Sequence, residues 1–158
     1  MYNALKISRP VLFALRTAAA MVLMIASSQV IARTPEATYA SECSACHMAY
    51  PAGLLPAPAW ERIMGSLKSH FGADASLDNS SKVAIAGFLV AHAGTNSRIK
   101  EPTQHDRITE TSWFKGRHGE VSSTVWTRSS VGHASNCGAC HRGASQGDFD
   151  EDNVHIPG

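Results

Sequence analysis

Two five-residue runs of the sequence, CSACH at residues 43–47 and CGACH at residues 137–141, carry the strongest signal in this chain. Both read C-x-x-C-H, and together they contain all four cysteines: Cys43, Cys46, Cys137 and Cys140. Two cysteines three positions apart lie on one side of a helical turn, where their sulfurs can reach two vinyl groups on one edge of a porphyrin. The histidine directly after them then lies beneath the iron as proximal ligand. The pattern predicts two covalently attached haem c groups, with His47 and His141 as proximal ligands.

Three other chemistries also use paired cysteines and stay open at this point. Each pair is compatible with a disulfide or with a thioredoxin-like redox pair, and the two pairs together are compatible with a Cys₄ zinc site. None of these requires a histidine at the next position, and here that histidine occurs twice with no cysteine left over. Haem attachment is therefore the interpretation that accounts for both motifs in full.

The first 32 residues follow the plan of a secretory signal peptide. A basic start, an apolar stretch and a cleavage site come in that order: Lys6, Arg9 and Arg16, then Thr17 to about Ala26, then Val30-Ile31-Ala32. The uninterrupted apolar run is about half of the roughly 20 residues that a membrane span requires. We predict cleavage near Ala32 and a periplasmic location, with an uncleaved anchor as the alternative. Export agrees with the motifs, because bacteria attach haem outside the cytoplasm.

The composition of the exported part argues for a modest core and against a nucleic-acid partner. Without residues 1–32, which hold three basic and no acidic residues, 11 Lys and Arg face 13 Asp and Glu, a formal charge of −2. Basic residues are thus neither in excess nor clustered, as nucleic-acid binding would require. Only 7% of the chain is aromatic, so the polypeptide alone buries little. We expect the haems to complete the core and the chain without haem to be largely unfolded.

Hydrophobic periodicity predicts short helices and no convincing strand, so the fold class is all-α: a small cytochrome-c-like helical protein with much loop. The expected helices are residues 35–47, 60–71, 81–93, 112–119 and 123–129. Three prolines keep residues 50–59 out of a long helix. Asn79, Ser80 or Ser81 is expected to cap the third helix. We divide the chain into a signal peptide at 1–32, a first haem-binding half at 33–96 and a second haem-binding half at 97–158.

Each iron needs a second axial ligand unless one position stays open, and methionine is poorly placed to supply it. The exported chain has only Met48, beside His47, and Met64, on an apolar helix face. Six further histidines remain: His70, His92, His105, His118, His133 and His155. His70 and His118 are the preferred candidates because each neighbours aromatic side chains, Phe71 in one case and Trp113 and Phe114 in the other. His92, three residues after Leu89 on an apolar face, is the strongest rival.

Several stretches of the chain match one known family. They are Glu42 to Pro51 with Gly53-Leu54-Leu55-Pro56, Trp60, His70-Phe71-Gly72, Ala75 to Asp78, Ile108-Thr109, Trp113-Phe114, His118, and the second motif followed by Gly143 and Gln146 to Phe149. In these residues the chain resembles the small periplasmic dihaem cytochromes c of Gram-negative bacteria. The resemblance covers nearly all of the chain after residue 32. It implies two six-coordinate, low-potential haems with His70 and His118 as distal ligands, and leaves open which serves which haem.

The function that follows is electron transfer without an enzymatic step. The resemblance implies donation of electrons to a small oxygen-binding monohaem cytochrome, in some relatives near a membrane b-type cytochrome, with neither nucleic acid nor a small-molecule substrate. Two histidine ligands leave no coordination site for substrate and stay the same in both oxidation states, so little reorganisation accompanies electron transfer. The alternative is a small haem peroxidase or oxygen-handling enzyme with one open iron site, in which His118 acts as an acid–base residue.

Overall fold

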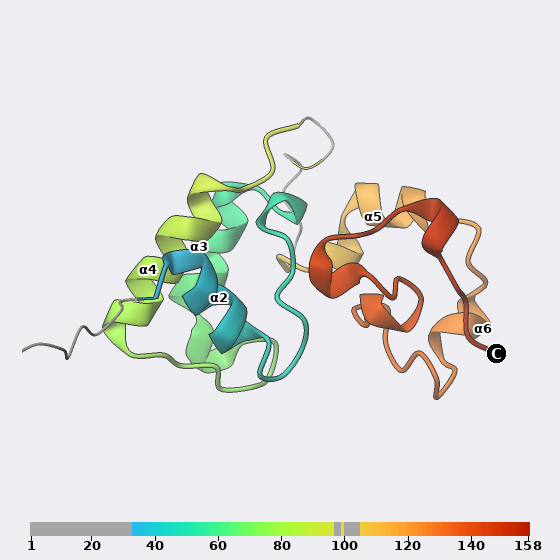
Figure 1. The fold of residues 1–158 in the computed structure, drawn as a ribbon, viewed down its shortest axis with the longest axis horizontal. Coiled ribbons are helices and arrows are strands. Elements are labelled where there is room, and N and C mark those ends of the chain that lie inside the picture. The colour runs from blue at the N-terminus through green and yellow to red at the C-terminus, as the bar shows by residue number, and fades with distance from the viewer. Residues whose placement is uncertain (1–32, 97–98, 100–104) are drawn as a thin grey trace, which may run out of the picture. The chain divides into compact units, whose positions relative to one another are not determined.

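The computed structural model describes residues 33–96, 99 and 105–158, and the predicted signal peptide at 1–32 lies outside these described residues. Helices, short 3-10 turns and loops make up the described chain (Figure 1). No strand occurs within it, and its only β pairing is two isolated bridges, His70 with Ala73 and His141 with Val154. The all-α class predicted from the sequence is confirmed. Among the described residues, none of the helices has both the length and the apolar character needed to cross a membrane.

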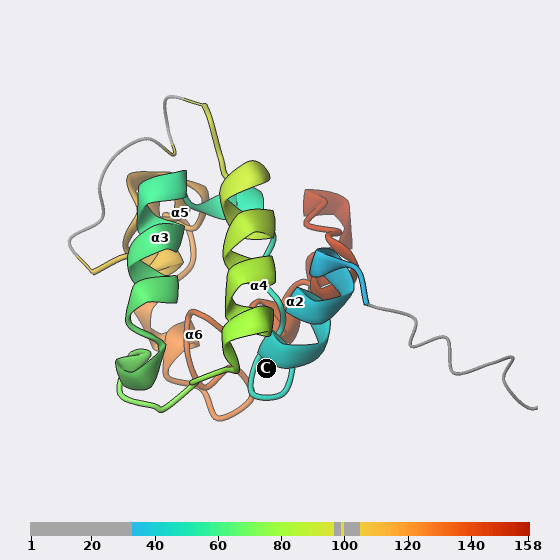
Figure 2. The ribbon, with the colours of Figure 1, turned by 90° about the vertical axis from the view of Figure 1, so that its left-hand side faces the viewer.

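The described α-helices are α2 (Pro35–Cys43), α3 (Ala57–Gly65), α4 (Asn79–Ala91), α5 (Ser112–Arg117) and α6 (Ser123–Trp126). The described 3-10 turns are η1 (Ala52–Leu54), η2 (Leu67–Ser69), η3 (Ile108–Glu110), η4 (Cys137–Ala139), η5 (Ala144–Gln146) and η6 (Glu151–Asn153). Helix α4 packs against both α2 and α3, as the view in Figure 2 shows. Helix α5 contacts η3, and η4 contacts η5. The first C-x-x-C-H run begins at the last residue of α2, and the second begins with η4.

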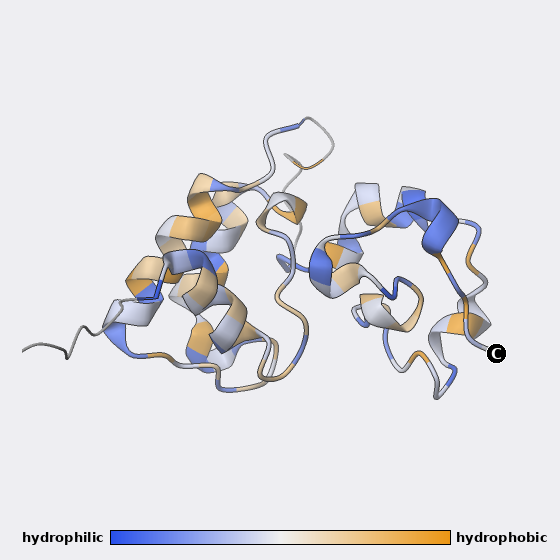
Figure 3. Ribbon diagram, viewed as in Figure 1, coloured by the Kyte–Doolittle hydropathy of each residue, from blue (hydrophilic) through white to orange (hydrophobic). Residues whose placement is uncertain are grey.

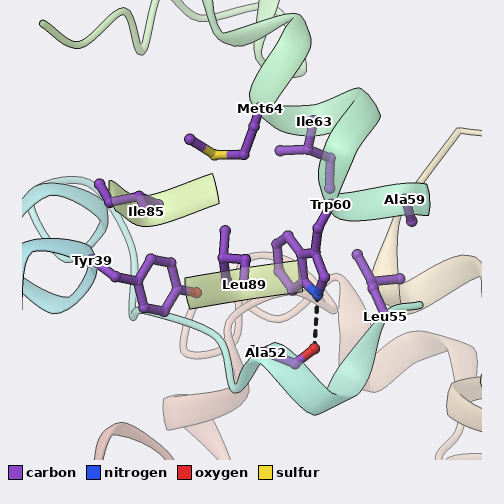
Figure 4. Close-up of a cluster of buried hydrophobic side chains, with 9 residues drawn as sticks. All are labelled: Tyr39, Ala52, Leu55, Ala59, Trp60, Ile63, Met64, Ile85 and Leu89. Atoms are coloured by element: carbon purple, nitrogen blue, oxygen red, sulfur yellow. Dashed lines mark hydrogen bonds between the residues drawn. The ribbon is translucent and has the colours of Figure 1, made fainter. Parts of the chain in front are cut away.

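The main hydrophobic core belongs to the first half and lies where α2, α3 and α4 meet (Figure 4). Its buried members are Tyr39, Ala52, Leu55, Ala59, Trp60, Ile63, Met64, Ile85 and Leu89. The indole of Trp60 donates a 2.7 Å hydrogen bond to the carbonyl of Ala52, so its polar atom is satisfied inside the core. Apolar residues concentrate in α4 (Figure 3). Burying a large apolar side chain such as Leu89 stabilises the fold by about 1.5–3 kcal/mol, and this core positions the first motif.

The helix ends differ from those predicted in ways that local hydrogen bonds explain. Helix α3 begins at Ala57. Proline is tolerated at position 58 because N–H groups in the first turn of a helix have no partner within the helix. The 3-10 turn η2 follows α3. It ends at Gly65 because the Ser66 hydroxyl bonds back to the carbonyl of Arg62 at 2.8 Å. Helix α4 begins at Asn79, and its cap is Asp78, whose carboxylate accepts the N–H groups of Ser80 and Ser81 at 2.9 and 3.0 Å. The three cap residues proposed from the sequence are wrong.

The second half is built from shorter elements around fewer buried side chains. Helix α5 has six residues and α6 has four, and both begin where the sequence predicted but end earlier. Helices this short are not stable alone and depend on packing. The buried apolar residues here are Ile99, Phe114, Val125, Val131 and Ala144. Thr111 caps α5 by accepting the N–H of Phe114 at 3.0 Å, which fixes the start of the helix that leads to His118.

Candidate haem-binding sites

The ring of His47, which follows the first cysteine pair, faces the ring of His70, the residue after η2. Their ring centres lie 6.1 Å apart and the ring planes differ by 25°. Two imidazoles on opposite sides of one metal, each with a nitrogen about 2 Å from it, have ring centres about 6 Å apart. The spacing therefore fits one metal atom between His47 and His70. A segment that follows α2 and a segment that follows α3 supply the two rings.

A second histidine pair has the same separation. The rings of His118, at the end of α5, and His141, at the end of the second motif, have centres 6.1 Å apart. Here the ring planes differ by 77°, so the two imidazoles are nearly perpendicular rather than nearly parallel. Sequence reasoning named all four histidines but left open which distal candidate belongs to which motif. The geometry brings His70 to His47 and His118 to His141, each within its own half.

One histidine of each pair has its Nδ1 atom bonded to a backbone carbonyl. His47 Nδ1 lies 2.7 Å from the oxygen of Met48, and His118 Nδ1 lies 2.9 Å from the oxygen of Phe114. A carbonyl only accepts, so in both rings Nδ1 carries the proton and donates it. The Nε2 atom is then left unprotonated with a lone pair, which is the form that binds a metal. These bonds also restrict rotation of the two rings.

Aromatic side chains hold the two distal candidates. His70 meets Phe71 edge-on with ring centres 4.8 Å apart. His118 stacks on Phe114 at 4.0 Å with an interplanar angle of 20°, and Trp126 lies 5.8 Å from the same ring. Phe71 and Phe114 are neighbours that the sequence analysis named, whereas it missed Trp126. The signal was present, because Trp126 falls in the predicted helix at 123–129, but its contact with His118 depends on tertiary packing.

Burial favours the neutral form of one histidine in each pair, His70 in the first and His141 in the second. Burial is the main cause that lowers the pKa of His70, and the charges of His47 and Arg107 add to it. The pKa of His141 is also lowered, again mainly by burial and further by the charge of His118. A metal ligand must be the neutral imidazole, so these shifts favour the ligating form near neutral pH. The Nδ1 atom of His141 is itself buried and has no hydrogen-bond partner.

The structure describes all four cysteines, and none of them forms a disulfide. Burial, together with the negative charge of Glu42, raises the pKa of Cys43 to about 11. Burial also raises the pKa of Cys137. Within the described residues, no three His, Cys, Asp or Glu side chains gather in a way that could hold a metal ion. The Cys₄ zinc arrangement is therefore not assembled, whereas pairs of histidines with adjacent thiols fit haem c.

Other histidines have other neighbours. His92 ends α4 and repeats the local structure of His118: its Nδ1 lies 2.8 Å from the carbonyl of Phe88, and its ring is 4.5 Å from the ring of the same residue. His105 lies 3.0 Å from the carboxylate of Glu110. Sequence position alone could not separate His92 from His118, since both follow a phenylalanine by four residues. What separates them in the fold is the facing ring of His141.

The whole pattern has a counterpart among known proteins. Residues 39–149 match the family model described as dihaem cytochrome c. The chain belongs to the dihaem cytochrome c family. As a member of this family it carries two covalently attached haem c groups, which confirms the cofactor predicted from the two C-x-x-C-H runs. A comparison with curated proteins gives no significant match.

Solved structures of dihaem cytochromes c have a similar fold. The X-ray structure of a dihaem cytochrome c from Shewanella baltica OS155 is 42% identical, with a TM-score of 0.70, over 78% of this chain and 94% of that one. A crystal structure of DHC purified from Rhodobacter sphaeroides is 48% identical, with a TM-score of 0.62, over 71% of this chain and 95% of that one. A second structure of a dihaem cytochrome c from Rhodobacter sphaeroides is 45% identical, with a TM-score of 0.64, over 71% and 94%. As in this family generally, electron transfer is the function.

Proposed function

We propose that this dihaem cytochrome c is a periplasmic electron carrier in which His47 and His70 bind one iron and His118 and His141 bind the other. The observation that carries the proposal is the equal separation of the two histidine pairs, 6.1 Å between ring centres in each. Each pair consists of one histidine from a C-x-x-C-H run and one of the two distal candidates preferred from the sequence. Cys43 and Cys46 then attach the first haem, and Cys137 and Cys140 attach the second.

The protein's own residues keep both irons closed and rigid. When bound, each haem supplies a one-electron ferric–ferrous couple. The Nδ1 bonds of His47 and His118 fix the orientation of one ring in each pair and increase its basicity as a ligand. Phe71 contacts the ring of His70 edge-on, and Phe114 and Trp126 pack against the ring of His118, which limits the movement of both distal rings. Two imidazoles favour the ferric state more than a thioether does, which corresponds to a low reduction potential.

The proposed setting is a chain of redox proteins outside the cytoplasm. A cleaved signal peptide at residues 1–32 would export the chain to the periplasm, where haem is attached. The family resemblance supports a small oxygen-binding monohaem cytochrome as the electron acceptor, with a membrane b-type cytochrome as a further redox partner. A bis-histidine protein needs no substrate site, so partner contact through protein surfaces is sufficient for this role.

Carbon monoxide tests the proposal, because it binds ferrous haem only where a coordination position is open or labile. We expect the reduced, purified protein with both haems to give the same absorption spectrum with and without carbon monoxide. His70→Ala and His118→Ala should each open one iron and bind about one carbon monoxide per chain, since each removes a single axial ligand. Absorption spectroscopy with stoichiometric titration measures both effects.

His92→Ala is the matched control for His118→Ala. It removes a histidine with the same backbone bond and the same aromatic neighbour four residues earlier, so it should leave the reduced spectrum insensitive to carbon monoxide. Binding of carbon monoxide by the unmodified protein would contradict the proposal and favour the peroxidase or oxygen-handling alternative. Binding by His92→Ala but not by His118→Ala would show that the ligand assignment in the second half is wrong.

A further inference from the structure

One tyrosine, Tyr50, joins the segment that follows the first C-x-x-C-H run to the segment that precedes the second. The ring of Tyr50, three residues after His47, stacks on the His47 imidazole with ring centres 4.9 Å apart and an interplanar angle of 27°. Its hydroxyl donates a 2.8 Å hydrogen bond to the carbonyl of Ser135. That carbonyl lies two residues before Cys137 and 3.6 Å from its sulfur. One aromatic ring and one hydrogen bond thus separate the first proximal histidine from the chain that attaches the second haem.

We propose that Tyr50 is the electronic bridge between the two haem sites, and that it sets the rate at which they exchange electrons. The inference rests on the proposed function, since it takes His47 as an iron ligand. In the exchange, one electron leaves the ferrous haem of one site and reduces the ferric haem of the other. No bond forms or breaks, no proton moves, and Tyr50 is neither oxidised nor reduced. The residue acts only as the medium through which the electron passes.

The position of Tyr50 is fixed from the side of the first half. Its own carbonyl accepts a 2.5 Å hydrogen bond from the hydroxyl of Tyr39, which is buried in the core between α2 and α4. Tyr39 is further packed against Phe88 of α4, with ring centres 5.6 Å apart. The backbone at Tyr50 therefore cannot shift without disturbing the main core. A bridge anchored in this way keeps its geometry through many electron-transfer cycles.

The position of Ser135, whose carbonyl accepts the hydrogen bond from Tyr50, is fixed as well. Asn136, directly after Ser135, donates its side-chain amide to the carbonyl of Val131 at 2.9 Å, and its backbone N–H bonds to the carbonyl of His133 at 2.9 Å. Val131 is one of the fully buried side chains of the molecule, at 2% exposure. Two hydrogen bonds from Asn136 to earlier residues thus hold the turn that presents the Ser135 carbonyl. Both ends of the bridge are rigid, which is what efficient electronic coupling requires.

Two further contacts between the halves, found among the described residues, do not involve His47 or His141. The guanidinium of Arg62 donates to the carboxylate of Asp106 at 2.9 Å, in an exposed ion pair. Arg107 lies over the ring of Phe71, 4.4 Å from its centre, and so touches the neighbour of a distal histidine. Neither contact continues to Cys137, Cys140 or His141. They hold the halves together by charge, whereas Tyr50 connects the redox centres.

The test compares Tyr50→Phe and Tyr50→Leu with Asp106→Asn in the complete protein carrying both haems. Tyr50→Phe keeps the stacked ring but loses the hydrogen bond, and Tyr50→Leu loses both. Asp106→Asn is the matched control, because it breaks the charged contact between the halves without touching His47 or Ser135. Asn also tolerates the positive φ of 54° found at this position. The rate of electron exchange between the haems is measured in the one-electron-reduced protein at equal driving force, after pulse reduction.

We expect exchange to slow several-fold in Tyr50→Phe and further in Tyr50→Leu, with Asp106→Asn at the rate of the unmodified protein. Equal slowing in all three variants would overturn the inference, because it would mean that any loosening of the halves has this effect. An unchanged rate in Tyr50→Phe would also overturn it, since the hydroxyl would then carry no coupling. The carbon monoxide experiment on the same unmodified protein fails or succeeds independently, so loss of the proposed function is distinguishable from loss of this bridge.

Discussion

The two haem-binding halves reach the same histidine spacing from very different amounts of packed chain. The first half surrounds its pair with three helices and a core of nine buried hydrophobic residues. The described part of the second half has helices of six and four residues, and five buried apolar side chains. Yet both pairs have ring centres 6.1 Å apart. A histidine pair can therefore be positioned by local bonds and aromatic stacking, without a large helical core.

The halves also differ in which histidine of the pair is supported. In the first half the proximal ring, His47, donates its Nδ1 proton to a neighbouring carbonyl. In the second half His118, the proposed distal ligand, makes this bond, and the Nδ1 of His141, the proposed proximal ligand, is buried without a partner. An unsatisfied buried polar atom costs about 1–3 kcal/mol. The second site thus depends more on its cofactor to fix the proximal ring, and the first depends more on the polypeptide.

Removal of one haem at a time should produce the largest difference between the halves. We expect Cys137→Ser with Cys140→Ser to unfold the second half, because its few buried side chains cannot replace the lost haem contacts. Cys43→Ser with Cys46→Ser should leave part of α3 and α4 protected, since Trp60, Ile85 and Leu89 still bury one another. Amide hydrogen exchange of the purified one-haem forms measures this. If each half keeps the same amide protection after losing its own haem, the two halves do not differ in their dependence on the cofactor.

A smaller effect is expected from single cavities in the two cores. Leu89→Ala should destabilise the protein by about 2–5 kcal/mol, because Leu89 is 1% exposed and its neighbours cannot all close the cavity. Val131→Ala removes two methyl groups from a buried site and should cost about 2 kcal/mol, at about 0.8 kcal/mol for each buried CH₂. Urea unfolding of the holoprotein measures both. If Val131→Ala lowers the free energy of unfolding by as much as Leu89→Ala does, the second core is packed as tightly as the first.

The sequence identified the chemistry of the sites better than their assembly. The C-x-x-C-H runs, the helical class and the preference for His70 and His118 follow from residue types and short spacings. The pairing of His118 with His141 could not be predicted in this way. The two histidines are 23 positions apart, and the residues between them have no hydrophobic periodicity that would bring the two rings together. The bond from Tyr50 to Ser135 spans 85 positions and is invisible to local patterns. His92 has the same local sequence signal as His118, so only the tertiary fold separates them.

The cap of α4 is a second feature that the sequence alone did not identify. Polar residues that can cap a helix occur at four successive positions, 78 to 81, and propensity does not choose among Asp, Asn and Ser. The choice of Asp78 follows from its extended backbone, which leaves its carboxylate beside the N–H groups of the first turn. In the second half Thr111 caps α5, and it is buried at 6% exposure. Asp78 is thus an exposed, charged cap, and Thr111 is a buried, neutral one. Replacing these two caps should give the smallest of the stability differences between the halves.

The two caps should differ in their dependence on pH. Hydrogen bonds from Ser80 and Ser81 hold the pKa of Asp78 below its ordinary value of 3.8. A carboxyl whose pKa is lower in the folded state contributes stability above 3.8, and that contribution is lost as the pH falls toward the folded value. Asp78→Ala should therefore lower stability at pH 7 and have less effect in acid. Thr111→Ala should cost about 0.5–2 kcal/mol at both pH values, because a hydroxyl cap does not titrate.

Asp78→Asn separates capping from charge in this experiment. Asparagine caps helices about as well as aspartate but carries no titratable group, so at pH 7 this variant should retain most of the stability that Asp78→Ala loses. Its stability should also fall less than that of the unmodified protein as the pH drops below 3.8. Urea midpoints of the holoprotein at both pH values measure the differences. If Asp78→Asn and Asp78→Ala lose the same stability at neutral pH, the charge of Asp78 acts on the α4 dipole rather than through its hydrogen bonds.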